Sequence, residues 1–171
     1  MLKIGETVRY GQSGLCTVQE KCEKEIGGEV QEYYVLIPFS KKGSMVFVPC
    51  GNSQLLEKIS LPLTKDEIDS LIKSVLDTPT QWIRDFRRRS DFSKKALASS
   101  DRKDPLLLIK TIYDHRSEES AGPVRIHTTD DYFLRDAEYL VYSEIAFVLG
   151  KEYSQVEREM RALFCPEKEE K

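Results

Sequence analysis

The sequence predicts an α+β protein of two parts, in which a small, strongly bent β-sheet closing toward a barrel precedes an all-α helical bundle. Residues 1–60 alternate between apolar and polar side chains in short runs separated by Gly-rich turns, which is the pattern of short strands. From residue 64 onward the apolar residues recur at helical spacing. The chain of 171 residues, 40% of them hydrophobic, is long enough for two small domains, and we place them at 1–60 and 64–165.

The first part is expected to hold five short strands. The apolar runs are separated by clusters that contain Gly, a residue that favours turns. In the run that begins at Leu15, the alternation places Cys16, Val18 and Glu20 on one face. The clearest runs are 7–10, 15–22, 32–37 and 45–49, with turns at 11–14, 26–29 and 41–44.

The second part is expected to hold four or five helices with recognisable ends. Thr64 and Glu67 form a capping box before the first helix, which should end near Asp77 because Pro79 follows. A long helix after Thr129 should end at Gly150, a residue that favours helix C-termini. The other predicted features are a helix over 81–98, a helix capped by Asp104-Pro105, a loop over 119–128 and a last helix that begins with a capping box at Ser154–Glu157.

The only tryptophan of the chain opens a basic run. Trp82 is followed by Arg84, Arg87, Arg88 and Arg89. Guanidinium groups can neutralise phosphates, and a flat ring can stack on a base or wedge against a base step. Taken alone, the segment favours ordinary packing, with the indole anchored in a core and the arginines reaching into solvent.

The charge of the chain is unevenly distributed. Residues 1–60 carry seven acidic and seven basic side chains, whereas residues 82–110 carry nine basic and four acidic ones. In a chain with a net charge of −3, this local excess is a candidate phosphate-facing surface. A solvated helix face is the alternative interpretation.

The sequence gives no sign of an enzyme. The four cysteines form no CxxC pair and only two histidines are present, so neither a zinc site nor another metal or cofactor is implied. No GxSxG, GxGxxG or phosphate-binding loop occurs, and no small-molecule substrate is indicated. There is no apolar stretch near 20 residues and no signal-peptide core at the N-terminus, so we expect a cytoplasmic protein with free thiols and no membrane contact.

The chain resembles the CarD-like (CarD/CdnL) bacterial transcription regulators over nearly its whole length. The segments that carry the resemblance are Lys3–Tyr10 with Gly14, Ile26–Glu29, Glu32–Leu36, Val46–Pro49, Trp82 with Arg84 and Arg87, and Leu97–Asp101. The N-terminal pattern is the more specific part, and the same module occurs in the transcription-repair coupling factor.

The resemblance implies a Tudor-like RNA polymerase-interacting domain and a helical DNA-binding domain. In such proteins the first docks on the β subunit of RNA polymerase, and the second contacts promoter DNA at the upstream edge of the melted region. The tryptophan, here Trp82, is a minor-groove wedge that stabilises the open complex. Its expected DNA-binding companions are Arg84, Arg87 and Arg88. The expected polymerase-binding residues are Lys24, Tyr34, Val46 and Phe47.

The sequence departs from the family pattern at several positions. Phe47 stands where a basic residue helps to grip polymerase, so it is either part of a more apolar docking surface or an ordinary core residue. On the long helix, where the family has lysines facing DNA, the chain has Asp131 and Asp136. These acidic residues keep a second hypothesis open, in which the chain is a polymerase-bound adaptor whose helical domain binds another protein rather than DNA.

Overall fold

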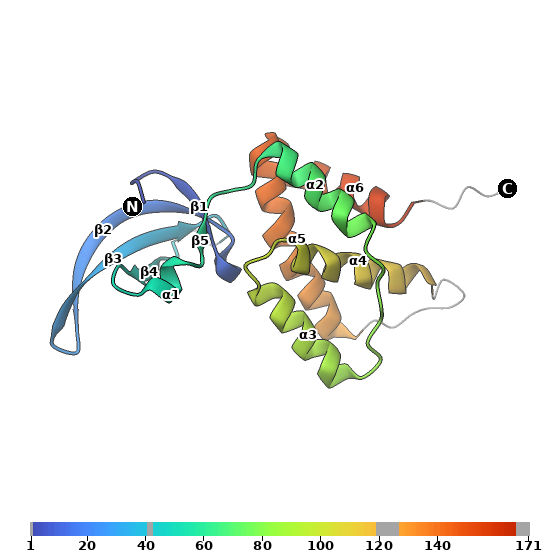
Figure 1. The fold of residues 1–171 in the computed structure, drawn as a ribbon, viewed down its shortest axis with the longest axis horizontal. Coiled ribbons are helices and arrows are strands. Elements are labelled where there is room, and N and C mark those ends of the chain that lie inside the picture. The colour runs from blue at the N-terminus through green and yellow to red at the C-terminus, as the bar shows by residue number, and fades with distance from the viewer. Residues whose placement is uncertain (1, 41–42, 119–126, 167–171) are drawn as a thin grey trace. The chain divides into compact units, whose positions relative to one another are not determined.

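The computed structural model describes residues 2–40, 43–118 and 127–166. It confirms an α+β chain in which an antiparallel sheet precedes a group of helices (Figure 1). The chain divides into two compact units, Met1–Pro62 and Leu63–Lys171. Each unit has its own cluster of buried apolar side chains, so each is described by itself.

The first unit is a five-stranded antiparallel sheet in the order β4-β3-β2-β1-β5. Two of its strands, β2 and β3, are long and curved and form a hairpin whose turn, Gly27-Gly28, has positive φ angles at both residues (Figure 1). The strands are β1 (Thr7–Tyr10), β2 (Leu15–Ile26), β3 (Glu29–Pro38), β4 (Val46–Pro49) and β5 (Ile59–Ser60), and a short helix, α1, spans Ser53–Leu56.

A β-bulge in β2 alters the predicted alternation. Val18 pairs with Leu36, but Glu20 pairs with Val35, so Gln19 is an extra residue in the ladder. Because one added residue reverses the faces beyond it, Glu20 leaves the side of Cys16 and Val18. The predicted common face of Cys16, Val18 and Glu20 is therefore wrong at its last position.

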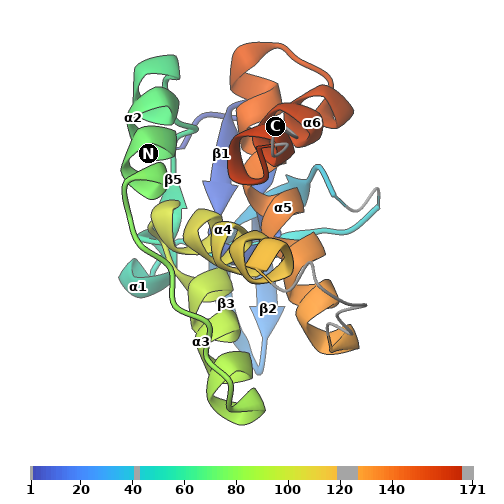
Figure 2. The ribbon, with the colours of Figure 1, turned by 90° about the vertical axis from the view of Figure 1, so that its right-hand side faces the viewer.

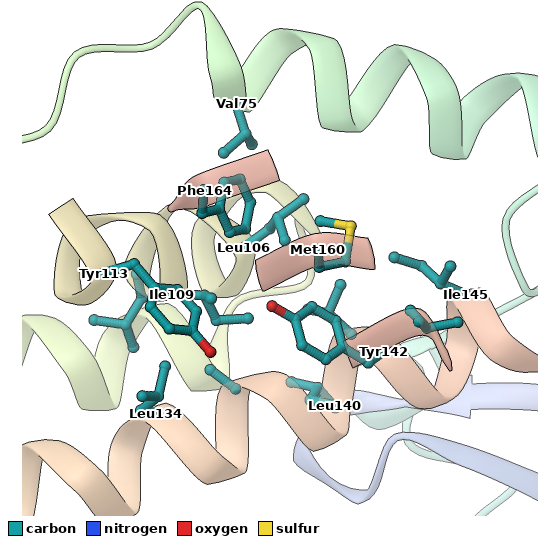
Figure 3. Close-up of a cluster of buried hydrophobic side chains, with 14 of the residues drawn as sticks. Val75, Leu106, Ile109, Tyr113, Leu134, Leu140, Tyr142, Ile145, Met160 and Phe164 are labelled. Atoms are coloured by element: carbon teal, nitrogen blue, oxygen red, sulfur yellow. The ribbon is translucent and has the colours of Figure 1, made fainter. Parts of the chain in front are cut away.

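The second unit contains five helices. They are α2 (Lys65–Leu76), α3 (Phe86–Ala98), α4 (Lys103–Glu118), α5 (Thr128–Leu149) and α6 (Tyr153–Phe164). Both α4 and α5 contact all the other helices of the unit, so these two form its centre (Figure 2). Their apolar faces meet α6 around Ile109, Tyr142 and Met160 (Figure 3).

Several predicted helix ends are confirmed. The Thr64–Glu67 capping box is formed, with each residue accepting a hydrogen bond from the other's backbone N–H. Helix α5 ends at Gly150 in the left-handed region, at φ 63°.

Other predicted ends are wrong for reasons that lie in neighbouring residues. Helix α3 begins at Phe86 rather than Gln81, because Asp85 caps it by accepting from the Arg88 N–H. Helix α5 is capped by His127 instead of Thr129, and α6 begins at Tyr153 without a side-chain cap. Most of the predicted loop over 119–128 lies outside the described residues.

Candidate nucleic-acid interface

The chain between α2 and α3 forms no regular secondary structure at residues 79–84, and it is attached to α4. The Lys110 ammonium donates to the backbone oxygen of Thr78 at 2.9 Å, and the Thr80 hydroxyl donates to the Asp114 carboxylate at 2.6 Å. Lys110 and Asp114 also form an ion pair one helical turn apart, at 3.3 Å. These bonds hold the segment that carries the tryptophan against one face of α4.

Trp82 lies in this segment, partly buried and packed against the core of the helical unit. The His115 ring of α4 stacks on the indole, with 3.8 Å between ring centroids and 10° between the planes. The Arg89 guanidinium carbon lies 4.6 Å from the indole centroid. The indole is therefore neither free in solvent nor sealed in the core: part of its surface is covered and part remains accessible.

The other predicted DNA-contacting residues surround the start of α3. Arg84 precedes the helix and Arg87 and Arg88 lie in its first turn, and all three are exposed. Among the described residues, none of these three guanidinium groups has an acidic partner. All four predicted DNA-binding residues thus lie between residues 82 and 88, the indole partly accessible and the three arginines exposed.

Sequence reasoning did not single out Phe86, Arg89 or His115. Phe86 is exposed at the first position of α3, and its ring lies 4.3 Å from that of His127. Arg89 belongs to the basic run but is mostly buried, so only its contacts distinguish it from its neighbours. His115 comes from α4, and nothing in its local sequence indicates a contact with Trp82.

The four predicted polymerase-binding residues lie on two faces of the sheet. Tyr34 is buried in the sheet core and Val46 packs against that core. Phe47 and Lys24 lie on the opposite face, where the Lys24 ammonium sits 3.4 Å from the Phe47 ring centroid. Tyr33 shares this second face and meets Phe47 edge-on at 6.4 Å. Phe47, Lys24 and Tyr33, rather than the predicted four, form the local cluster.

The two acidic residues of α5 have different surroundings. Asp131 lies in the first turn and forms an ion pair with Arg116 of α4, which offsets its charge. Asp136 is exposed. Exposed aromatic side chains, Tyr132, Tyr139 and Phe147, occur along the same helix.

Three of the four cysteines have thiols whose pKa values are raised. Burial raises the pKa of the Cys16 thiol to about 11 and also raises the pKa values of Cys50 and Cys165, which disfavours the nucleophilic thiolate. No group of three His, Cys, Asp or Glu side chains that could hold a metal occurs in the described part of the chain. No helix within those ranges combines the length and apolar character needed to cross a membrane.

Residues 2–60 match the model of the CarD-like/TRCF RID domain family. The match includes all five strands and α1, so it covers the sheet unit and none of the helices α2–α6. No curated protein matches the chain.

Proposed function

We propose that this chain, whose residues 2–60 form a CarD-like/TRCF RID domain with an RNA polymerase-interacting role, is a transcription regulator that stabilises the promoter open complex. In this proposal the sheet unit binds the β subunit of RNA polymerase. Trp82 acts as a wedge at the edge of the melted DNA, and Arg84, Arg87 and Arg88 contact phosphates.

The observation that carries the DNA-binding part is the accessible portion of the indole, followed within six residues by three exposed arginines that have no acidic partner in the described part of the chain. Because His115 already stacks on the ring, the indole cannot be sandwiched between two bases. It can still press an edge or its remaining surface against one base step, which is how apolar wedges unstack DNA in the minor groove. The geometry therefore favours a wedge over an intercalator.

The energies involved are compatible with one ring and a few charges. Unstacking a base step costs about a few kcal/mol, and each 1.4 kcal/mol changes a lifetime about tenfold. Phosphate contacts from a few arginines alone would give weak, non-specific and salt-sensitive binding. Docking on polymerase would raise the effective concentration of the helical unit at promoters and so supply the missing affinity.

The docking part rests on the RID domain and on the cluster of Phe47, Lys24 and Tyr33. An exposed cation above an aromatic ring gives a partner both a charge and an apolar contact. Aromatic side chains such as Phe47 and Tyr33 are enriched at protein interfaces.

The direct test is Trp82→Ala in the full chain. The measurement is the lifetime of open complexes on a promoter, formed by the polymerase of the same organism with and without the protein. We expect the added lifetime to be lost while binding to polymerase is retained. An unchanged added lifetime would reject the wedge.

A matched control is Tyr132→Ala, which removes an exposed aromatic ring on α5. It should leave the added lifetime intact if Trp82 is the wedge.

A second candidate function is a polymerase-bound adaptor whose helices bind another protein. The observation that favours it is the exposed aromatic series on α5, Tyr132, Tyr139 and Phe147, beside the acidic Asp136. A mobility-shift titration over a range of salt concentrations separates the candidates, since phosphate neutralisation gives a steep salt dependence. No shift of promoter DNA, even with polymerase present, would favour the adaptor.

A further inference from the structure

We infer that Arg89 is a positioning residue that holds Trp82 in the orientation required of a wedge, through a buried ion pair with Asp130. The inference rests on the proposed function of Trp82 and extends it to residues outside the DNA contact. It assigns Arg89 a role different from that of its basic neighbours, because its guanidinium bonds to groups of the protein rather than to DNA.

The hydrogen bonds of Arg89 link three parts of the helical unit. Its Nε and Nη2 donate to Oδ1 and Oδ2 of Asp130 in the first turn of α5, at 3.0 and 2.9 Å. Its Nη1 donates to the backbone oxygens of Ile83 and Arg84, at 2.8 and 3.1 Å. One guanidinium on α3 therefore ties the two residues that follow Trp82 to the start of α5.

These backbone oxygens belong to chain that forms no helix or strand, so no regular ladder holds them in place. The Arg89 guanidinium also lies against the indole, at 4.6 Å from its centroid. On the other side of Trp82 along the chain, Thr78 and Thr80 are bonded to α4. The tryptophan is thus tethered both before and after its own position, and Arg89 supplies the tether that follows it.

Burial and bond geometry make this ion pair specific for arginine. The side chains of Arg89 and Asp130 are 11% and 2% exposed. At such a buried position, solvent screens a paired charge only weakly, and an unpaired charge is costly. The planar guanidinium fork matches the two carboxylate oxygens while its third nitrogen serves the backbone. A lysine ammonium at the same place would keep the charge but not this set of directed bonds.

A held ring has a functional advantage. An indole that must be ordered at the moment of binding loses side-chain and loop entropy, which weakens the contact. An indole that folding has already ordered loses little further entropy when it binds, so the wedge is preorganised. The expected consequence is that loosening Arg89 weakens the wedge even though Trp82 is present.

The chain offers a matched control for this test. Arg102, just before α4, and Glu144 of α5 form a second buried ion pair in the same unit, at 3.1 Å and with side chains 13% and 2% exposed. Glu144 also accepts from the Leu63 N–H, so this pair holds the start of the unit instead of the tryptophan segment. Arg89→Lys and Arg102→Lys are therefore comparable changes with different neighbours.

The experiment uses the full chain and its single tryptophan. Acrylamide quenching of Trp82 fluorescence reports the accessibility of the indole, and open-complex lifetime reports the wedge; circular dichroism confirms that each variant is folded. In Arg89→Lys we expect stronger quenching and a loss of about 2- to 10-fold in the added lifetime, the range for immobilising one side chain. Arg102→Lys should change neither. Asp130→Asn provides a second way to loosen the same tether and should behave as Arg89→Lys does.

Two outcomes would overturn the inference: unchanged quenching in Arg89→Lys and Asp130→Asn, or equal losses of added lifetime in Arg89→Lys and Arg102→Lys. Failure of the proposed function gives a different result, since Trp82→Ala would then leave the lifetime unchanged. In that case the quenching still decides whether Arg89 positions the indole.

Discussion

Each unit of this protein places a cationic side chain beside an aromatic ring, but the two sites are built differently. Arg89 lies 4.6 Å from the Trp82 centroid, and Lys24 lies 3.4 Å from the Phe47 centroid. Arg89 is mostly buried and has four hydrogen bonds to Asp130 and to the backbone. Lys24 is exposed, and within the described ranges it has no acidic partner.

The comparison shows that a short cation–ring distance does not by itself indicate what the pair does. All three guanidinium nitrogens of Arg89 donate to groups within the protein, so Arg89 is suited to holding its ring in place. An ammonium whose only described contact is a ring remains available, so Lys24 is suited to docking. Burial and hydrogen-bond partners distinguish the two roles.

The largest expected difference between the two sites is in stability. Arg89→Ala leaves the buried Asp130 carboxylate without its partner, which should lower the free energy of unfolding by about 3–5 kcal/mol. Lys24→Ala removes only an exposed contact and should leave it nearly unchanged. Urea denaturation followed by circular dichroism measures both. Equal effects would remove the distinction between the two sites.

The next effect concerns polymerase binding. Phe47→Asp puts a charge in the proposed docking cluster and should weaken binding to the isolated β subunit by about 30-fold or more, the loss typical of a residue that dominates an interface. Met45→Asp, at an exposed position just before β4, is the control and should have little effect. Binding is measured by surface plasmon resonance, after circular dichroism has shown that the sheet is intact. If Phe47→Asp binds the β subunit as tightly as the original chain, Phe47 has no part in docking.

A smaller effect is expected from each exposed arginine beside Trp82. Replacing Arg84, Arg87 or Arg88 with Ala should reduce the slope of log affinity for DNA against log salt by about 0.9 for each phosphate that the protein no longer neutralises. Arg158→Ala, at an exposed position of α6, changes the charge equally and should leave the slope unchanged. A slope that falls equally in all four variants would indicate a general charge effect without a defined site.

The smallest effect belongs to Lys24. Removing its ammonium from the Phe47 ring should weaken binding to the β subunit by about 2- to 5-fold, as expected for an exposed cation–π contact. Lys24→Arg keeps a cation near the ring and should retain most of the affinity. If Lys24→Ala binds as tightly as the original chain, docking depends on the apolar part of the cluster alone.

Local signals in the sequence predicted several elements well. The capping box of Thr64 and Glu67 and the stop at Gly150 depend on residues a few positions apart, so they can be read directly from the chain. The start of α3 was misplaced for a comparable local reason. Asp85 caps the helix four positions after Gln81, the expected start, and its significance is clear only when the Arg88 N–H is seen to bond to it.

The candidate sites depended more on tertiary contacts. A strand read by simple alternation puts Lys24 on the same face as Cys16 and Val18, away from Phe47. The extra residue at Gln19 moves Lys24 to the face of Phe47, and the sequence carries no evident sign of that bulge. Val46 and Phe47 are consecutive in β4 and lie on opposite faces in any register, so what the bulge decided is that Lys24 joins Phe47.

By itself, the sequence determined the order of the two parts, the family pattern of the first, and the run in which a single indole lies among arginines. Only the tertiary structure decided which arginine is taken from solvent, because the Arg89–Asp130 bond joins residues 41 positions apart. Local patterns report on neighbours along the chain, whereas burial and ion pairing depend on which helices meet. The four arginines are alike in the sequence, and their environments in the folded unit separate the one that holds Trp82 from the three that face outward.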